Sequence, residues 1–99
     1  MVKQVIWSNT AKTSKQEILS YWTKRNKSNR FSKILNKLLK DASKIIGEFP
    51  LAGKSTGRPD IRIKIVRDYL IFYKISDDRI LILFIWDGRR NPEDLQWTY

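Results

Sequence analysis

The sequence contains no cysteine and no histidine. Without cysteine, a disulfide scaffold and a thiolate metal site are both excluded. Without histidine, the usual general base and the commonest metal ligand are missing together. We therefore expect no metal and no cofactor, and any catalysis would have to use Lys, Arg, Tyr, Asp or Glu.

Long apolar runs are absent as well. No stretch approaches the roughly 18 apolar residues that span a bilayer, and Met1 to Trp7 contain no signal-peptide core. We expect a cytoplasmic protein with no membrane partner. The chain has 99 residues without a repeat or a linker, which predicts a single domain over residues 1–99.

Acidic residues are few. The chain has 20 Lys and Arg against 10 Asp and Glu, a net charge of +10, while a hydrophobic fraction of 41% excludes a disordered tail. Some of these lysines are expected on solvent-exposed helix faces, where they need no binding partner. The excess over neutrality is large, however, and it favours polyanionic partners, such as RNA, DNA or an acidic protein segment.

The first half of the sequence predicts a short strand and two helices. Val2 to Trp7 is the strand, and Ser8 is placed to cap a helix that runs to about Lys24. Ser28 is placed to cap the second helix, which should end at Gly47. The apolar stripe of the first helix comprises Ala11, Ser14, Ile18, Tyr21 and Trp22; that of the second comprises Phe31, Ile34, Leu35, Leu38, Leu39, Ala42, Ile45 and Ile46.

The second half predicts three strands, Ile61 to Val66, Tyr69 to Ile75 and Arg79 to Trp86. Their links are short, so neighbouring strands should be antiparallel. The predicted fold is α+β in the order β-α-α-β-β-β, with a helical hairpin packed on one face of a mostly antiparallel four-stranded sheet.

Alternation in the first of these strands predicts that Arg62 and Lys64 share one side, opposite Ile61, Ile63 and Ile65. A basic strand face of this kind could meet phosphates or could simply be solvated. Further basic candidates are Arg67, Arg89 and Arg90. Paired guanidiniums at a strand end, as at Arg89 and Arg90, suit bidentate binding of oxyanions.

The last two strands are apolar on both sides, and alternation groups Leu81, Leu83 and Ile85 on one of them. Two interpretations stay open for the side that the helices do not cover. It is a partner interface, or it is covered by the first strand, the long loop and the C-terminal tail. Trp97 is a candidate interface anchor.

Several segments, in their order along the chain, resemble the RelE/ParE superfamily of bacterial toxins. They are Ile6-Trp7-Ser8, Phe49-Pro50-Leu51-Ala52-Gly53, Arg62-Ile63-Lys64-Ile65, Tyr69 to Ile75, and Gly88-Arg89-Arg90. The resemblance implies the toxin of a type II toxin–antitoxin pair, held in a hetero-oligomer by its cognate antitoxin. We expect the antitoxin to contact Leu81, Leu83, Ile85 and Trp97.

The superfamily implies two alternative targets. RelE-like members cut messenger RNA on the ribosome without a metal, and ParE-like members inhibit DNA gyrase. Arg62, Lys64, Arg89 and Arg90 match the basic positions and are the catalytic candidates, and with Arg67 they are the candidates for target binding. Leu70, however, stands where nucleases commonly carry an Arg. The candidates for proton transfer are Asp87, Glu93, Asp94, Tyr73 and Tyr99, and none matches the nuclease pattern. The departures favour the gyrase target slightly, and a basic nucleic-acid-binding module that is not a toxin remains the alternative.

Overall fold

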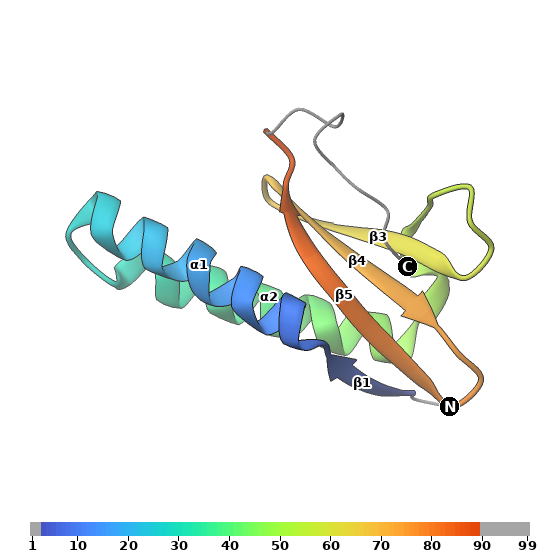
Figure 1. Cartoon of the computed structure of the whole chain (residues 1–99). Coiled ribbons are helices and arrows are strands. Elements are labelled where there is room, and N and C mark those ends of the chain that lie inside the picture. Colours follow the sequence, from blue (N-terminus) through green and yellow to red (C-terminus); the bar gives the residue numbers. More distant parts are fainter. Residues whose placement is uncertain (1–2, 90–99) are drawn as a thin grey trace.

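The computed structural model describes residues 3–89. Two long helices, α1 (Asn9–Asn26) and α2 (Arg30–Glu48), follow the first strand, β1 (Gln4–Trp7). A 3-10 turn, η1 (Pro50–Ala52), and a short strand, β2 (Lys54–Ser55), then lead to the meander β3 (Ile61–Val66), β4 (Tyr69–Ile75) and β5 (Arg79–Asp87). The helical hairpin packs on the sheet, and its far end extends beyond the sheet (Figure 1).

The sheet has the order β1-β5-β4-β3-β2. β1 runs parallel to β5, and the other neighbours are antiparallel. The predicted α+β fold and its element order are confirmed. The expected number of strands was one too low, because Lys54 and Ser55 pair with Ile63 and Arg62 inside the segment that was expected to be a loop. A two-residue strand carries no alternation that sequence inspection could detect.

The first helix begins as predicted, and Ser28 takes part both in the end of the first helix and in the start of the second. Ser8 Oγ accepts a hydrogen bond from Ala11 N–H and caps α1. Lys27 ends α1 in the left-handed conformation (φ 53°), and Ser28 N–H then bonds to the Thr23 carbonyl. The Ser28 Oγ atom also accepts a hydrogen bond from Arg30 N–H at 3.2 Å, so this serine contributes to the start of α2 as predicted. The N-cap position itself is Asn29, whose side chain makes no capping bond.

Gly47 does not end α2. It is buried within the helix, which runs on to Glu48, and its carbonyl accepts a hydrogen bond from Lys3 N–H. The glycine lies where the start of β1 passes close to α2, and the helix stops just before Pro50, which begins η1.

The main core lies between the helices and one face of the sheet. It joins Leu35, Leu39 and Ile46 of α2 to Ile71 and Tyr73 of β4 and to Ile80, Ile82 and Ile85 of β5. Tyr21, Ile34 and Ile45 were expected on the buried stripes, yet they are 49%, 47% and 40% exposed. No helix within residues 3–89 combines the length and apolar character that crossing a membrane requires.

Candidate functional site

The segment between α2 and β2 is fixed by the phenol of Tyr73. Its hydroxyl donates to the Pro50 carbonyl (2.7 Å) and accepts from Gly53 N–H (3.0 Å). A Cβ on Gly53 would lie 2.5 Å from this hydroxyl and 2.7 Å from the Ile63 carbonyl oxygen. Burial raises the pKa of the Tyr73 phenol, while the hydrogen bond from Gly53 and the charge of Arg62 lower it. Tyr73, a candidate for proton transfer, is therefore a buried and doubly bonded structural group.

Arg62 belongs to the same arrangement. Its Nη1 atom donates to the Gly53 carbonyl at 2.7 Å and lies 3.5 Å from the Leu51 carbonyl. Arg62 pairs with Tyr73 across β3 and β4, so both side chains project from the same face of the sheet, the one that packs on the helices. The guanidinium binds the carbonyl of Leu51 in η1 and that of Gly53, which links η1 to β2.

The basic strand face therefore lies on the helix side of the sheet. Ile61 and Ile63 belong to a separate apolar cluster on the outer face, which contains strand residues alone among those described. Lys64 instead lines a shallow groove of about 280 Å³ with Leu38 and Ile45 of α2. Alternation correctly separated Arg62 and Lys64 from the isoleucines, but it could not tell which side the helices would cover.

Arg67 lies at the turn between β3 and β4 in the left-handed conformation (φ 57°) and is exposed. It lines the same groove as Lys64 and Ile65. The turn places its side chain beside the end of β3, at the opposite end of that strand from Arg62.

Arg89 lies just beyond β5 in a cluster of charged and aromatic groups. Its backbone N–H and Nε both donate to Asp87 Oδ1 at 3.0 Å, and its Nη2 donates to Oδ2 at 2.9 Å. This hydrogen bonding raises the pKa of the Arg89 guanidinium. Its Cζ atom lies 5.6 Å from the centre of the Trp22 ring. Asp87, another proposed proton-transfer group, thus holds Arg89 against α1.

Trp22 links this cluster to the core. Its Nε1 donates to Tyr69 Oη at 2.6 Å, and its ring packs edge-on against Tyr21 and Phe31. A second guanidinium, that of Arg25, lies 5.9 Å from the Trp22 ring centre and bonds to Tyr21 Oη. We call Trp22, Arg25, Tyr69, Asp87 and Arg89 the Trp22 cluster. Sequence analysis missed Arg25 and Tyr69; the three-residue spacing of Trp22 and Arg25 on a helix was the available signal.

The structure does not bring the basic candidates to one point. Arg62 lies opposite Tyr73, while Asp87, which holds Arg89, lies opposite Tyr69. Those two tyrosines are four residues apart in β4, which is about 13 Å along the strand. Arg90, Glu93, Asp94, Trp97 and Tyr99 lie outside the described residues.

The outer face of the sheet differs from the prediction because of a bulge. The β4–β5 pairing shifts between Phe72 and Tyr73, so that Phe72 faces Phe84 and Tyr73 faces Ile82. Leu83 is the extra residue. Leu81, Leu83 and Phe84 therefore share the outer face, whereas Ile85 turns into the main core. Grouping Ile85 with Leu81 and Leu83 was wrong, because strict alternation does not survive a bulge.

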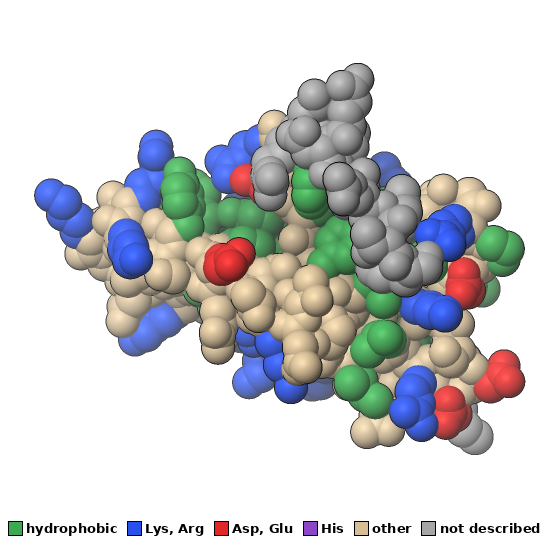
Figure 2. Space-filling view, viewed as in Figure 1, with side chains coloured by type: hydrophobic (Ala, Val, Ile, Leu, Met, Phe, Trp, Pro, Cys, Tyr) green, Lys and Arg blue, Asp and Glu red, His purple; other side chains and the backbone are tan. Residues whose placement is uncertain are grey.

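The most exposed large apolar side chains lie elsewhere, on and beside α2. Ile34, Ile45 and Phe49 are 47%, 40% and 62% exposed and follow one side of the helix and its end. Leu51 is 70% exposed. We call these four residues the α2 stripe. Ile65, which is 45% exposed, pairs with Leu70 of the outer face. On the face shown in Figure 2, both basic and acidic side chains lie near the apolar areas. Within residues 3–89 no cluster of three or more potential acidic, His or Cys metal ligands occurs.

Comparison with known proteins places these features in a family context. A family model described as "ParE toxin of type II toxin-antitoxin system, parDE" matches residues 5–92. A solved structure titled "Chromosomal ParDE TA system from P. aeruginosa" is similar in fold, with a TM-score of 0.74 and 14% identity. The similarity covers 85% of this chain and 94% of that one. No curated protein matches the sequence significantly.

Proposed function

Because the chain belongs to the ParE toxin family of type II toxin–antitoxin systems, we propose that it inhibits DNA gyrase by binding, without cutting RNA, and that a cognate antitoxin neutralises it. The proposal concerns the target and the contact surfaces. Its main support is that Arg62 and Tyr73, two candidates for catalysis, are hydrogen-bonded to backbone groups of the protein itself.

A metal-independent ribonuclease of the RelE type needs a basic group that stabilises the phosphorane and a second group that transfers a proton. Here Arg62 is bonded to the carbonyls of Gly53 and Leu51, and Tyr73 is bonded to Pro50 and Gly53. Proton transfer by Tyr73 would require breaking the bonds that fix η1, and the Nη1 atom of Arg62 is already bonded to the same segment. This cost favours a binding function over a cleavage function.

The Trp22 cluster is the proposed contact site for the target. Two guanidiniums lie near one half-buried indole, and Arg and Trp are the residue types that contribute most to protein–protein affinity. Asp87 fixes Arg89 in one orientation, so less side-chain entropy is lost on binding. An acidic or carbonyl-rich surface of gyrase would complement the cluster.

The α2 stripe is the proposed binding site for the antitoxin. Its apolar side chains lie beside Lys64 and Arg67, which line the same groove as Ile45 and Ile65. An amphipathic antitoxin segment with acidic residues next to its apolar face would match both features. This assignment replaces the expected antitoxin contact through Leu83, which is only 6% exposed.

The experiment is a gyrase supercoiling assay with purified toxin, with primer extension on messenger RNA in parallel. Arg89→Ala should weaken gyrase inhibition at least tenfold, because it removes one guanidinium from the Trp22 cluster. The matched control is Arg79→Ala, since Arg79 also pairs with a neighbouring aspartate, Asp78, but lies at the other end of β5. Equal inhibition by both variants, or strong ribosome-dependent cleavage by the unmodified toxin, would contradict the proposal.

A further inference from the structure

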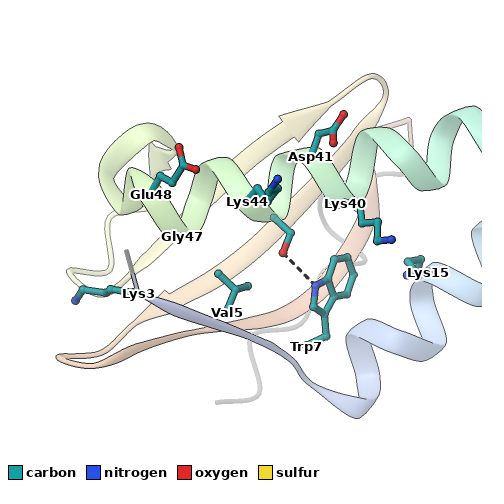
Figure 3. Close-up of a pocket in the computed structure, with 10 residues that line it drawn as sticks. Lys3, Val5, Trp7, Lys15, Lys40, Asp41, Lys44, Gly47 and Glu48 are labelled. Atoms are coloured by element: carbon teal, nitrogen blue, oxygen red, sulfur yellow. Dashed lines mark hydrogen bonds between the residues drawn. The ribbon is translucent and has the colours of Figure 1, made fainter. Parts of the chain in front are cut away.

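A basic groove lies between β1 and the C-terminal half of α2, away from the Trp22 cluster. Its volume is about 650 Å³, and the residues that matter here are Lys3, Val5, Trp7, Lys15, Lys40 and Lys44. A second hollow, of about 510 Å³, shares Val5, Trp7 and Lys15 and adds Lys12. Figure 3 shows Trp7 and Val5 on the β1 side and Lys40 and Lys44 on the α2 side. We call this the β1–α2 groove.

The lysines of the groove differ in whether their ammonium groups already contact another group of the protein. Lys3 donates to the Ser76 carbonyl at 2.6 Å, and the Lys15 ammonium lies 5.2 Å from the centre of the Trp7 ring. Lys12, Lys40 and Lys44 are exposed and make no ion pair with the described residues. The acidic groups on the groove are Asp41 and Glu48, and Asp41 lies 4.0 Å from Lys37. The groove is therefore strongly positive, with lysines on both of its sides.

Trp7 is held in place inside this positive groove. Its Nε1 atom donates to Ser43 Oγ of α2 at 3.2 Å, a bond that joins the two sides of the groove (Figure 3). The indole is half-buried and packs on the main core. An anchored aromatic ring between lysines is the arrangement that proteins use to stack or contact a base beside a bound phosphate chain.

Backbone donors add to the positive field. Lys3 N–H points away from β5 to Gly47, whereas Ser8 N–H points toward β5 and bonds to Ile82. Because strand amides alternate in direction, Val5 and Trp7 direct their N–H groups to the same free edge as Lys3. β1 is an outer strand of the sheet, so this edge borders the groove.

We propose that the β1–α2 groove binds single-stranded nucleic acid, with Lys12, Lys40 and Lys44 on phosphates and Trp7 beside a base. A strand-to-helix groove of this volume admits one backbone but not a duplex, which carries its paired phosphates on a much wider cylinder. The inference does not depend on gyrase being the target, because it uses no residue of the Trp22 cluster.

The test measures fluorescence anisotropy of labelled 12-nucleotide DNA and RNA strands against the full chain at 50 to 200 mM salt. Three lysine–phosphate contacts predict a slope of about −2 in log K against log salt, or roughly 20-fold weaker binding across this range. Lys40→Gln with Lys44→Gln should reduce the slope to about −0.7 and weaken binding at 50 mM on the order of 50-fold.

The matched control is Lys24→Gln with Lys33→Gln, which removes the same charge from exposed helix positions outside the groove. It should leave the slope near −2. Equal losses in both double variants would show general electrostatic attraction and overturn the groove assignment. Absence of binding at 50 mM, tighter binding of the matching duplex, or equal binding of a poly-glutamate peptide would also overturn it.

Discussion

At the residue scale, one hydroxyl determines the path of the chain between α2 and β3. Tyr73 Oη binds Pro50 and Gly53, and Arg62 binds the Gly53 carbonyl from the other side. The segment Phe49 to Gly53 was noted in the sequence only through its resemblance to known toxins. The structure supplies a physical reason for two of its residues: Pro50 starts the 3-10 turn, and Gly53 leaves space for the phenol.

Gly53→Ala should destabilise the protein by about 1–3 kcal/mol, because the new Cβ would overlap the Tyr73 hydroxyl and the Ile63 carbonyl. Gly57→Ala is the control. Gly57 has open space around it but a φ of 90°, so only the left-handed backbone strain of about 1 kcal/mol applies. Urea unfolding measures both. A Gly53 variant as stable as the wild type would show that the phenol moves aside freely.

Tyr73→Phe should lower the free energy of unfolding by about 1–3 kcal/mol at neutral pH, because Gly53 N–H and the Pro50 carbonyl lose their partner. The difference from wild type should shrink at alkaline pH. The pKa of Tyr73 is raised in the folded state above 10.0, so the unfolded chain releases the proton first and wild-type stability falls as pH rises through 10. The Phe variant lacks this loss. Unfolding free energies at pH 8 and pH 11 give the comparison, and a constant gap would contradict it.

At the scale of the elements, hydrophobic periodicity located both helices and the three long strands, because apolar residues recur in the sequence every 3.6 residues in a helix and every two residues in a strand. It could not locate the β5 bulge, since apolar residues occupy every position from Ile80 to Trp86. Nor could it choose the face of Arg62, which depends on packing between distant segments. Periodicity therefore could not separate the surroundings of the two arginines: Arg89 lies in the Trp22 cluster, whereas Arg62 binds the backbone at Gly53 and Leu51.

Two adjacent isoleucines in α2 allow the effect of core packing to be measured apart from the effect of a surface contact, because Ile46 is buried and Ile45 is exposed. Ile46→Ala should cost about 2–5 kcal/mol, because the side chain is 0% exposed. Ile45 is 40% exposed, so Ile45→Ala should lower the free energy of unfolding by about 1 kcal/mol or less. The same variant should weaken antitoxin binding about tenfold if the α2 stripe is the antitoxin-binding site. Chemical unfolding and titration calorimetry with purified antitoxin measure the two effects. Unchanged affinity of the Ile45 variant would remove the stripe from the interface.

At the scale of the whole molecule, the net charge of +10 is spread over several surfaces with different roles. Lys64 and Arg67 border the α2 stripe, Arg25 and Arg89 flank Trp22, and the β1–α2 groove carries its own lysines. Attraction between distant charges is screened by salt over about 8–10 Å at physiological ionic strength. Burial of apolar surface is not screened.

The antitoxin complex should therefore weaken with salt only in part. We expect nanomolar affinity at low salt and a complex that still survives gel filtration at 1 M NaCl. Antitoxin at about 100 times its Kd should raise unfolding free energy by about 2.7 kcal/mol, or the Tm by roughly 10–20 °C for a chain of this size. Differential scanning calorimetry at two salt concentrations measures both effects. Complete dissociation at high salt would mean that charge alone joins the partners.

The pairing of β1 with β5 also sets the order in which the protein can be completed during translation. Gln4 lies opposite Arg79, and Ser8 Oγ donates to the Leu83 carbonyl. The helical hairpin is built from neighbouring residues and can form early, whereas β1 must wait for β5. A chain released before residue 79 cannot form the β1 edge that borders the lysine groove. The strand β1 can therefore dock on the sheet only after β5 has been synthesised.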